Sequence, residues 1–163
     1  MRFLLLVLVF LLPAAAHAQL SGFYTIGGSS PDYATISAAV ADLNAQGVSG
    51  PTRFAIRAGT YTEQISIDAI TGTSAADTVQ FRAANPSNRP TIRFNGLAAN
   101  NYVWRIVDSD HIKLRNLDFV ATGGDINARV LVVEGDSDDL SVAGCTLTGL
   151  AGTTTSAGTL LYA

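Results

Sequence analysis

The sequence predicts an all-β solenoid, a right-handed parallel β-helix with one N-terminal capping α-helix. The first observation is a repeat: the segment 108–119 recurs as 136–147, so the offset is constant at 28. Apolar positions stay apolar in both copies while the residues between them change. A fixed period of this length is typical of solenoids, in which each repeat buries its apolar face by stacking on the next. The second observation is a single helical pattern at about residues 34–46, which we expect to form the cap.

Each repeat is expected to form two short strands joined by a one-residue corner. Ile112 and Leu114 alternate with charged residues, so we expect them to face inward and Lys113 to face outward. Asn116 and its counterpart Gly144 stand at the corner, and these two residue types adopt positive φ most easily. The residues expected in the core include Leu117, Phe119, Val142 and Leu147.

Residues 1–18 have the pattern of a secretory signal peptide, which would leave residues 19–163 as the mature chain. Arg2 precedes an apolar run from 3 to 12, and Ala16-His17-Ala18 fits the small-x-small cleavage pattern. The run is too short to cross a bilayer, although an uncleaved anchor remains an alternative. We therefore expect a secreted or cell-surface protein with no membrane span after cleavage.

Composition narrows the classes of partner. The 163 residues suit one domain, and 48% hydrophobic residues suit a packed body. The net charge of −3 argues against a nucleic-acid partner. The mature chain has one cysteine, Cys145, so it has no internal disulfide framework. Because Cys145 lies opposite Leu117 in the repeat, we expect it to be a small buried hydrophobic residue.

Helix and strand signals precede the repeat. Asp32 or Thr35 can cap the helix at its start, and Gly47 follows as its stop. One apolar stripe at helical spacing comprises Ile36, Ala39, Val40 and Leu43. Short strands separated by turn residues are expected at 23–26, 53–56, 63–67, 78–81 and 91–94. The strand at 79–81 aligns with Ile112–Leu114, a wider offset of 33.

The segment Tyr102–Val107 matches Val130–Gly135 at the same offset of 28, which places Trp104 opposite Val132. Its apolar residues do not decide which side faces inward. A third copy begins at Gly158, and the sequence stops at Ala163 inside an apolar strand. We therefore expect residues 19–163 to be the cap and first coils of a truncated solenoid, with further β-helix coils of an intact chain as partners.

Two segments resemble the opening of pectin methylesterases. They are Asp32-Tyr-Ala-Thr-Ile-Ser-Ala-Ala-Val40 and Arg57-Ala-Gly-Thr-Tyr-Thr-Glu-Gln-Ile-Ser-Ile67. In that family a helix with this pattern caps a right-handed parallel β-helix, and the Gly-x-Tyr-x-Glu segment leads into the first coil. Similar openings occur in secreted bacterial proteins with pectin-lyase-like β-helices, many of them without known activity. The resemblance covers roughly residues 22–70 and implies the fold.

The catalytic residues of that family do not carry over to this sequence. The family uses a glutamine in Gln-Asp-Thr, two aspartates, one of them in Asp-Phe-Ile-Phe-Gly, and a later arginine. The sequence contains no Gln-Asp-Thr, and Asp118-Phe119-Val120 matches the second motif for only three residues. We therefore expect Asp118 to be an ordinary outward strand residue and assign no catalytic residue.

Acidic residues gather at the corners of the repeat and form a possible metal site. Asp108 and Asp110 should stack under Asp136 and Asp138 in the next coil, with Glu134 and Asp139 nearby. Hard oxygen ligands at such a turn can hold Ca²⁺. We favour the alternative, in which Asp and Ser bond to the backbone of solvated turns, and so expect no cofactor. A glycosidase pair is a further alternative that the pattern does not distinguish.

Three further side chains bear on function. Tyr102 and Trp104 could form a sugar-stacking platform, but Trp104 fits the core equally well. His111 is expected to be a surface turn residue. The leading hypothesis is a non-catalytic secreted β-helix scaffold or surface protein whose candidate partner is an extracellular polysaccharide. The alternative is the N-terminal portion of a pectinesterase- or pectate-lyase-like enzyme whose catalytic coils lie beyond residue 163.

Overall fold

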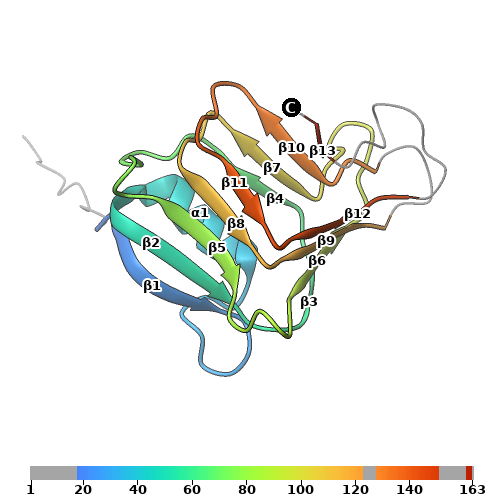
Figure 1. The fold of residues 1–163 in the computed structure, drawn as a ribbon, viewed down its shortest axis with the longest axis horizontal. Coiled ribbons are helices and arrows are strands. Elements are labelled where there is room, and N and C mark those ends of the chain that lie inside the picture. The colour runs from blue at the N-terminus through green and yellow to red at the C-terminus, as the bar shows by residue number, and fades with distance from the viewer. Residues whose placement is uncertain (1–17, 123–127, 151–160, 163) are drawn as a thin grey trace, which may run out of the picture.

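The computed structural model of the protein describes residues 18–122, 128–150 and 161–162. Parallel strands stack into three sheets around one core, as Figure 1 shows, and this confirms the predicted all-β solenoid. Within these residues the sheets comprise about four coils, and one short helix accompanies them. Most of the expected signal peptide, residues 1–17, lies outside the described part of the chain.

Each of the four coils contributes one strand to each sheet, and sheet A has one further strand at its first-coil end. Sheet A contains β1 (Leu20–Ile26), β2 (Val48–Ile56), β5 (Val79–Ala83), β8 (Ile112–Arg115) and β11 (Ser141–Ala143). Sheet B contains β3 (Thr60–Thr62), β6 (Thr91–Phe94), β9 (Asp118–Ala121) and β12 (Thr146–Thr148). Sheet C contains β4 (Ile65–Ile67), β7 (Trp104–Val107), β10 (Leu131–Glu134) and β13 (Leu161–Tyr162).

The corner between sheets A and B forms as the repeat predicts. Asn116 has φ 56° and Gly144 has φ 66°, so both adopt the left-handed conformation. A Cβ atom at Gly144 would collide with the Asn116 side-chain amide, so a larger residue there would displace that amide, whereas glycine leaves it in place. The constant offset holds here, since Val142 pairs with Leu114 and Leu147 with Phe119. The wider offset between β5 and β8 is also confirmed, because Val79 pairs with Ile112.

The register between β7 and β10 corrects the predicted alignment. Trp104 pairs with Leu131 and Arg105 with Val132, so the offset here is 27. After Gly135 the offset between the two copies is again 28, since Asp136 bonds to Asp108. Gly135 has φ 70° and lies directly against the Asp108 side chain. Gly135 therefore lies at the point where the second copy gains a residue.

The structure also settles the orientation of β7 and the pairing of the last strand. Trp104 and Ile106 are buried, whereas Arg105 is half-buried on the outside. Leu161 of β13 pairs with Leu131 of β10, so the offset widens to 30. The expected start of the third copy, Gly158, lies outside the described residues.

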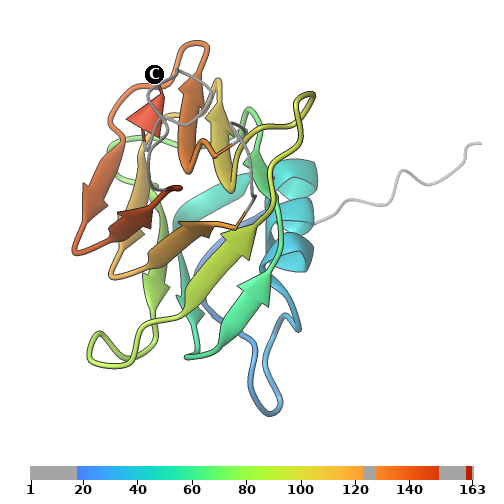
Figure 2. The ribbon, with the colours of Figure 1, turned by 90° about the vertical axis from the view of Figure 1, so that its right-hand side faces the viewer.

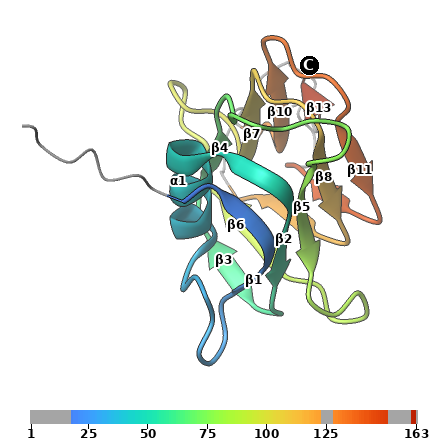
Figure 3. The same ribbon diagram turned by 90° about the vertical axis from the view of Figure 1, so that its left-hand side faces the viewer.

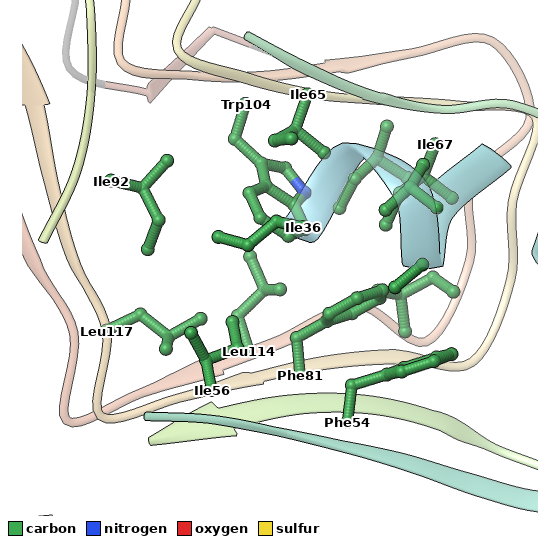
Figure 4. Close-up of a cluster of buried hydrophobic side chains, with 14 of the residues drawn as sticks. Ile36, Phe54, Ile56, Ile65, Ile67, Phe81, Ile92, Trp104, Leu114 and Leu117 are labelled. Carbon is green, nitrogen blue, oxygen red and sulfur yellow. The ribbon is translucent and has the colours of Figure 1, made fainter. Parts of the chain in front are cut away.

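The core is a column of aromatic rings enclosed by aliphatic side chains, several of which are shown in Figure 4. Phe54 stacks on Phe81 with ring centroids 4.7 Å apart, and Trp104 lies edge-on to Phe81 at 5.2 Å. Trp104 is also edge-on to Phe119 at 5.6 Å. Each ring comes from a different strand, so the column ties successive coils together.

The predicted core positions divide into two groups. Leu117 and Phe119 are fully buried, as expected, and Leu147 is partly buried against the core. Val142 is 38% exposed, so its assignment to the core was wrong. Val142 lies on β11, the last strand of sheet A, where it pairs with Leu114 on one side and has no described strand on the other.

Helix α1 (Ile36–Gln46) packs against β1, β2 and β4 at the first-coil end, as Figure 2 and Figure 3 show. The Thr35 hydroxyl accepts the Ala38 N–H at 3.1 Å, so Thr35 is the N-cap, and Gly47 follows with φ 66°. The Glu63 carboxylate reaches the same helix end and accepts the Ser37 N–H at 2.7 Å. The Gly-x-Tyr-x-Glu segment therefore fastens the capping helix to the first coil.

Candidate functional site

The outer face of sheet A carries a line of side chains that runs across the strands, four of them polar and one aromatic. Cα pairing places Phe23, Arg53, Gln80, Lys113 and Ser141 next to one another in that order. We call these five residues the outer row. Neighbouring strands lie about 4.8 Å apart, so consecutive side chains of the row stand side by side. Figure 1 shows the strands that carry the row.

A second line of outward residues makes this face basic. Arg82 and Arg115 pair on neighbouring strands, two positions beyond Gln80 and Lys113. With Arg53 and Lys113 they form what we call the basic face. None of the five strands of sheet A contains an aspartate or glutamate. The face is therefore locally positive in a chain whose net charge is −3.

Three of the four cations of the basic face make hydrogen bonds, and none of the four makes an ion pair within the described residues. Lys113 Nζ donates to Thr78 Oγ1 at 3.3 Å, and Arg115 Nη2 donates to Ser141 Oγ at 3.0 Å. Arg82 Nε donates to a backbone carbonyl at 3.3 Å. The ion pairs found in residues 18–122 and 128–150 involve other side chains. The positive charge of this face is therefore available to an external anion.

A hollow of about 340 Å³ lies where β5, β8 and β11 begin. It is lined by Ala75, Thr78, His111, Lys113, Asp139, Leu140 and Ser141. His111 faces Asp139 across neighbouring corners, with 3.0 Å between Nδ1 and Oδ2. Both corner residues have positive φ, 60° and 54°. Hydroxyl, ammonium, imidazole and carboxylate groups thus converge on one space, an arrangement that can bind a hydroxylated group.

The corner acids stack between coils as predicted, and their contacts are with the backbone. Asp108 Oδ1 accepts the Asp136 N–H at 2.9 Å, and Asp110 Oδ1 accepts the Asp138 N–H at 2.7 Å. This is the side-chain-to-backbone bonding that we favoured. Within the described residues no group of three His, Cys, Asp or Glu side chains is arranged to hold a metal ion. The Ca²⁺ alternative stays an untested prediction.

The proposed sugar platform of Tyr102 and Trp104 does not form as a pair. Trp104 is fully buried, so its ring cannot meet a ligand and the core alternative is correct. Tyr102 is half-buried, and the Arg105 guanidinium lies 4.9 Å from its ring centroid. Sequence reasoning missed Arg105, which also donates to Ser66 Oγ at 3.2 Å and lies 3.7 Å from Glu134. The sequence pattern of residues 102–107 does not decide which side faces outward, whereas the burial of β7 places Arg105 on the outside.

Two other candidates have structural partners. Arg89 Nη2 lies 2.9 Å from Asp118 Oδ1, and Arg89 Nη1 donates to the Gly144 carbonyl at 2.6 Å. Asp118 is thus an outward strand residue that joins a link between coils. Cys145 is half-buried, and burial raises the pKa of its thiol above the ordinary value. The raised pKa lowers the thiolate fraction and so disfavours nucleophilic chemistry at this residue.

Comparison with solved structures supports the fold. Two crystal structures of the pectin methylesterase from Aspergillus niger, in deglycosylated and penultimately deglycosylated forms, match 89% of this chain with TM-scores of 0.61 and 0.63. Sequence identity is 22% in both cases, and the chain spans 46% of the length of each esterase chain. No protein-family model and no curated protein sequence matches the chain.

Proposed function

We propose that this chain is a secreted, non-catalytic β-helix scaffold that binds glycans on the outer face of sheet A. The observation that carries the proposal is the outer row with its adjoining hollow. The row offers hydrogen-bond donors and acceptors at a regular spacing of about 4.8 Å, set by the parallel strands. Sugar hydroxyls are recognised by groups of this kind, and a repeated surface binds a repeating polymer through several weak contacts at once.

The contacts of the acidic side chains support a non-catalytic role. Asp118 is engaged by Arg89, and Glu63 by the start of α1. Asp42 accepts a hydrogen bond from the Tyr33 hydroxyl at 3.0 Å. These carboxylates have partners that account for their positions without a substrate. A glycan-cleaving pair requires one acid and one base that face a shared sugar, and the contacts of these acids do not suggest such a pair.

Secretion is part of the proposal and rests on residues 1–18. The described residues contain no helix that is both long and apolar enough to cross a membrane. Mass spectrometry of the chain recovered from culture medium tests the cleavage site. A mature chain that begins at Gln19 supports the proposal, whereas a cell-retained chain that keeps Met1 contradicts it.

A second candidate is the N-terminal portion of a pectinesterase- or pectate-lyase-like enzyme with its catalytic coils beyond residue 163. It is favoured by the similarity to pectin methylesterase structures and by the 46% of their length that the chain spans. In this case, the coils seen here would serve as the foundation on which catalytic coils stack. The sequence of the intact gene separates the candidates, because a downstream Gln-Asp-Thr together with Asp-Phe-Ile-Phe-Gly favours the enzyme.

A glycan array combined with pectin de-esterification and lyase assays on the purified chain tests the leading proposal. We expect binding to at least one polysaccharide and no turnover. Turnover by this chain would refute the non-catalytic role. Binding that survives in a chain with the double substitution Lys113→Ser and Ser141→Ala would refute the placement of the site on sheet A.

A further inference from the structure

We propose that the outer face of sheet A selects glycans that carry anionic groups, and that the glycan lies along the outer row with one sugar in the hollow. This inference rests on the proposed glycan-binding function. It adds the charge of the ligand and the direction in which the ligand lies relative to the strands. The shared chemistry is a carboxylate or sulfate group on a sugar chain. Neutral glycans would meet the same hydroxyl-binding groups without the charge.

The distribution of charge carries the first step. Four of the ten basic residues lie on the basic face, although the chain as a whole is acidic. Arg82 and Arg115 are direct neighbours on adjacent strands, where like charges repel. Neither is neutralised by an ion pair within the described residues. An anion bound between them would remove the repulsion, so this face favours a negatively charged ligand.

The geometry of the rows sets the direction of the ligand. The outer row crosses five strands and therefore extends about 19 Å, the length of several sugars. Arg53 and Lys113 belong to this row, whereas Arg82 and Arg115 lie about 7 Å to one side, two residues along their strands. A chain laid across the strands meets Arg53 and Lys113 directly and has Arg82 and Arg115 beside it, four charges in all. A chain laid along one strand would meet only one or two charges.

The two ends of the outer row suit a sugar chain. At one end, the hollow beside Lys113 is lined by the hydroxyls of Thr78 and Ser141 and by the Asp139 carboxylate, all of which can bond to sugar hydroxyls. A sugar in the hollow therefore presents its hydroxyls there, while the anionic groups of the glycan lie over the basic face. At the other end, Phe23 is 60% exposed, so its ring is free to cover the apolar face of a sugar. Nucleic acid is the less favoured polyanion, because the hydroxyls that line the hollow suit the free hydroxyls of a glycan, which a DNA strand lacks along its backbone.

The test measures binding of the full secreted chain to an alginate oligosaccharide, in which every sugar carries a carboxylate. Comparison ligands are the same oligosaccharide with its carboxylates converted to amides, dextran sulfate, neutral dextran and single-stranded DNA. The double variant Arg53→Ser and Lys113→Ser removes two cations of the row. The matched control is Arg93→Ser, which removes an exposed arginine from β6 of sheet B.

We expect the alginate oligosaccharide to bind at least about tenfold more tightly than its amide, with the preference lost as salt screens the charges. The double variant should lose about tenfold in affinity and Arg93→Ser less than twofold, as for surface ion pairs removed two at a time. Dextran sulfate binding equal to alginate extends the site to sulfate, and weaker binding restricts it to carboxylate.

Four results would overturn the inference. Equal affinity for the oligosaccharide and its amide removes the charge preference while leaving glycan binding intact. Tighter binding of single-stranded DNA than of either anionic glycan reassigns the basic face to nucleic acid. A free-energy loss in Arg93→Ser of half the loss in the double variant, which removes twice the charge, shows that the effect is one of net charge and not of this face. Failure to bind any glycan removes the proposed function as well.

Discussion

Glu63 should stabilise the protein by fastening the capping helix to the first coil. Its carboxylate accepts the Ser37 N–H at 2.7 Å and the Ser37 hydroxyl at 2.6 Å, and it lies 3.4 Å from the Ile36 nitrogen. Hydrogen bonds to a charged group contribute about 1.5–3 kcal/mol, and a negative charge at a helix N-terminus adds about 0.3–1 kcal/mol. Glu63 is half-buried and the Thr35 cap remains, so we expect Glu63→Ala to cost about 2 kcal/mol.

Urea unfolding followed by far-UV circular dichroism measures this cost. A loss of about 2 kcal/mol in a chain of this size lowers Tm by about 4–8 °C. Glu63→Gln keeps one acceptor oxygen but removes the charge, so it should lose about half as much as Glu63→Ala. Thr62→Ala is the control, because Thr62 is exposed on β3 and leaves the Glu63 contacts intact.

The reasoning fails if Glu63→Ala and Thr62→Ala unfold at the same urea concentration. It also fails if Glu63→Gln is as damaging as Glu63→Ala, since the charge alone would then account for the effect. Thr35→Ala provides an internal scale, because losing an N-cap hydroxyl costs about 0.5–2 kcal/mol. Glu63→Ala and Thr35→Ala should therefore lower the free energy of unfolding by comparable amounts.

Three further predictions test the core, an inter-coil link and a half-buried hydroxyl. In urea unfolding, Phe119→Ala should lower the free energy of unfolding by about 3–5 kcal/mol. Lys113→Ala should change it by no more than about 0.5 kcal/mol. Similar losses in the two variants would contradict the assignment of Phe119 to the core and of Lys113 to the outer face. Arg89→Ala should lower the free energy of unfolding by about 1–3 kcal/mol, because the guanidinium joins Asp118 to the next coil. An unchanged unfolding midpoint would show that this link does not contribute to stability. Burial, followed by the hydrogen bond to a carboxylate, raises the pKa of Tyr33 from 10.0 to about 12. Because the folded-state pKa is the higher one, this stabilisation is complete below pH 10 and is lost as the pH rises towards about 12; Tyr33→Phe should abolish that part of the pH dependence.

The sequence predicts the fold well where the repeat is regular. Apolar alternation and the corner pair Asn116 and Gly144 identify two stacked coils, because only inward positions must stay apolar and only the corner needs positive φ. The prediction fails at Gly135, where one added residue changes the offset, since a corner can absorb a residue without disturbing the strands on either side. It also fails at Val142, because the burial of a side chain depends on whether another strand packs next to its own strand, and not only on the alternation of apolar residues.

The basic face could not be found from the sequence because the spacing between its residues is irregular. The outer row passes from Arg53 to Gln80, then to Lys113 and then to Ser141, and these three steps in residue number are all unequal. Loops of different length separate the strands, so no single period aligns the row. Only strand pairing shows that these residues are neighbours. The Glu63 contact is hidden for a similar reason, since its partner Ser37 lies far earlier in the chain.

The aromatic column gives this protein a built-in optical probe. Trp104 is the chain's one tryptophan, and its indole lies between Phe81 and Phe119 with no hydrogen-bond partner for its N–H in the described part of the chain. Its emission should therefore be shifted to short wavelength in the folded protein. Opening of β11 at the edge of sheet A would leave this environment intact, whereas separation of the inner coils would expose the ring. Dichroism that declines before the fluorescence changes would thus reveal a solenoid that frays from its end, and simultaneous loss would reveal one that opens as a single unit.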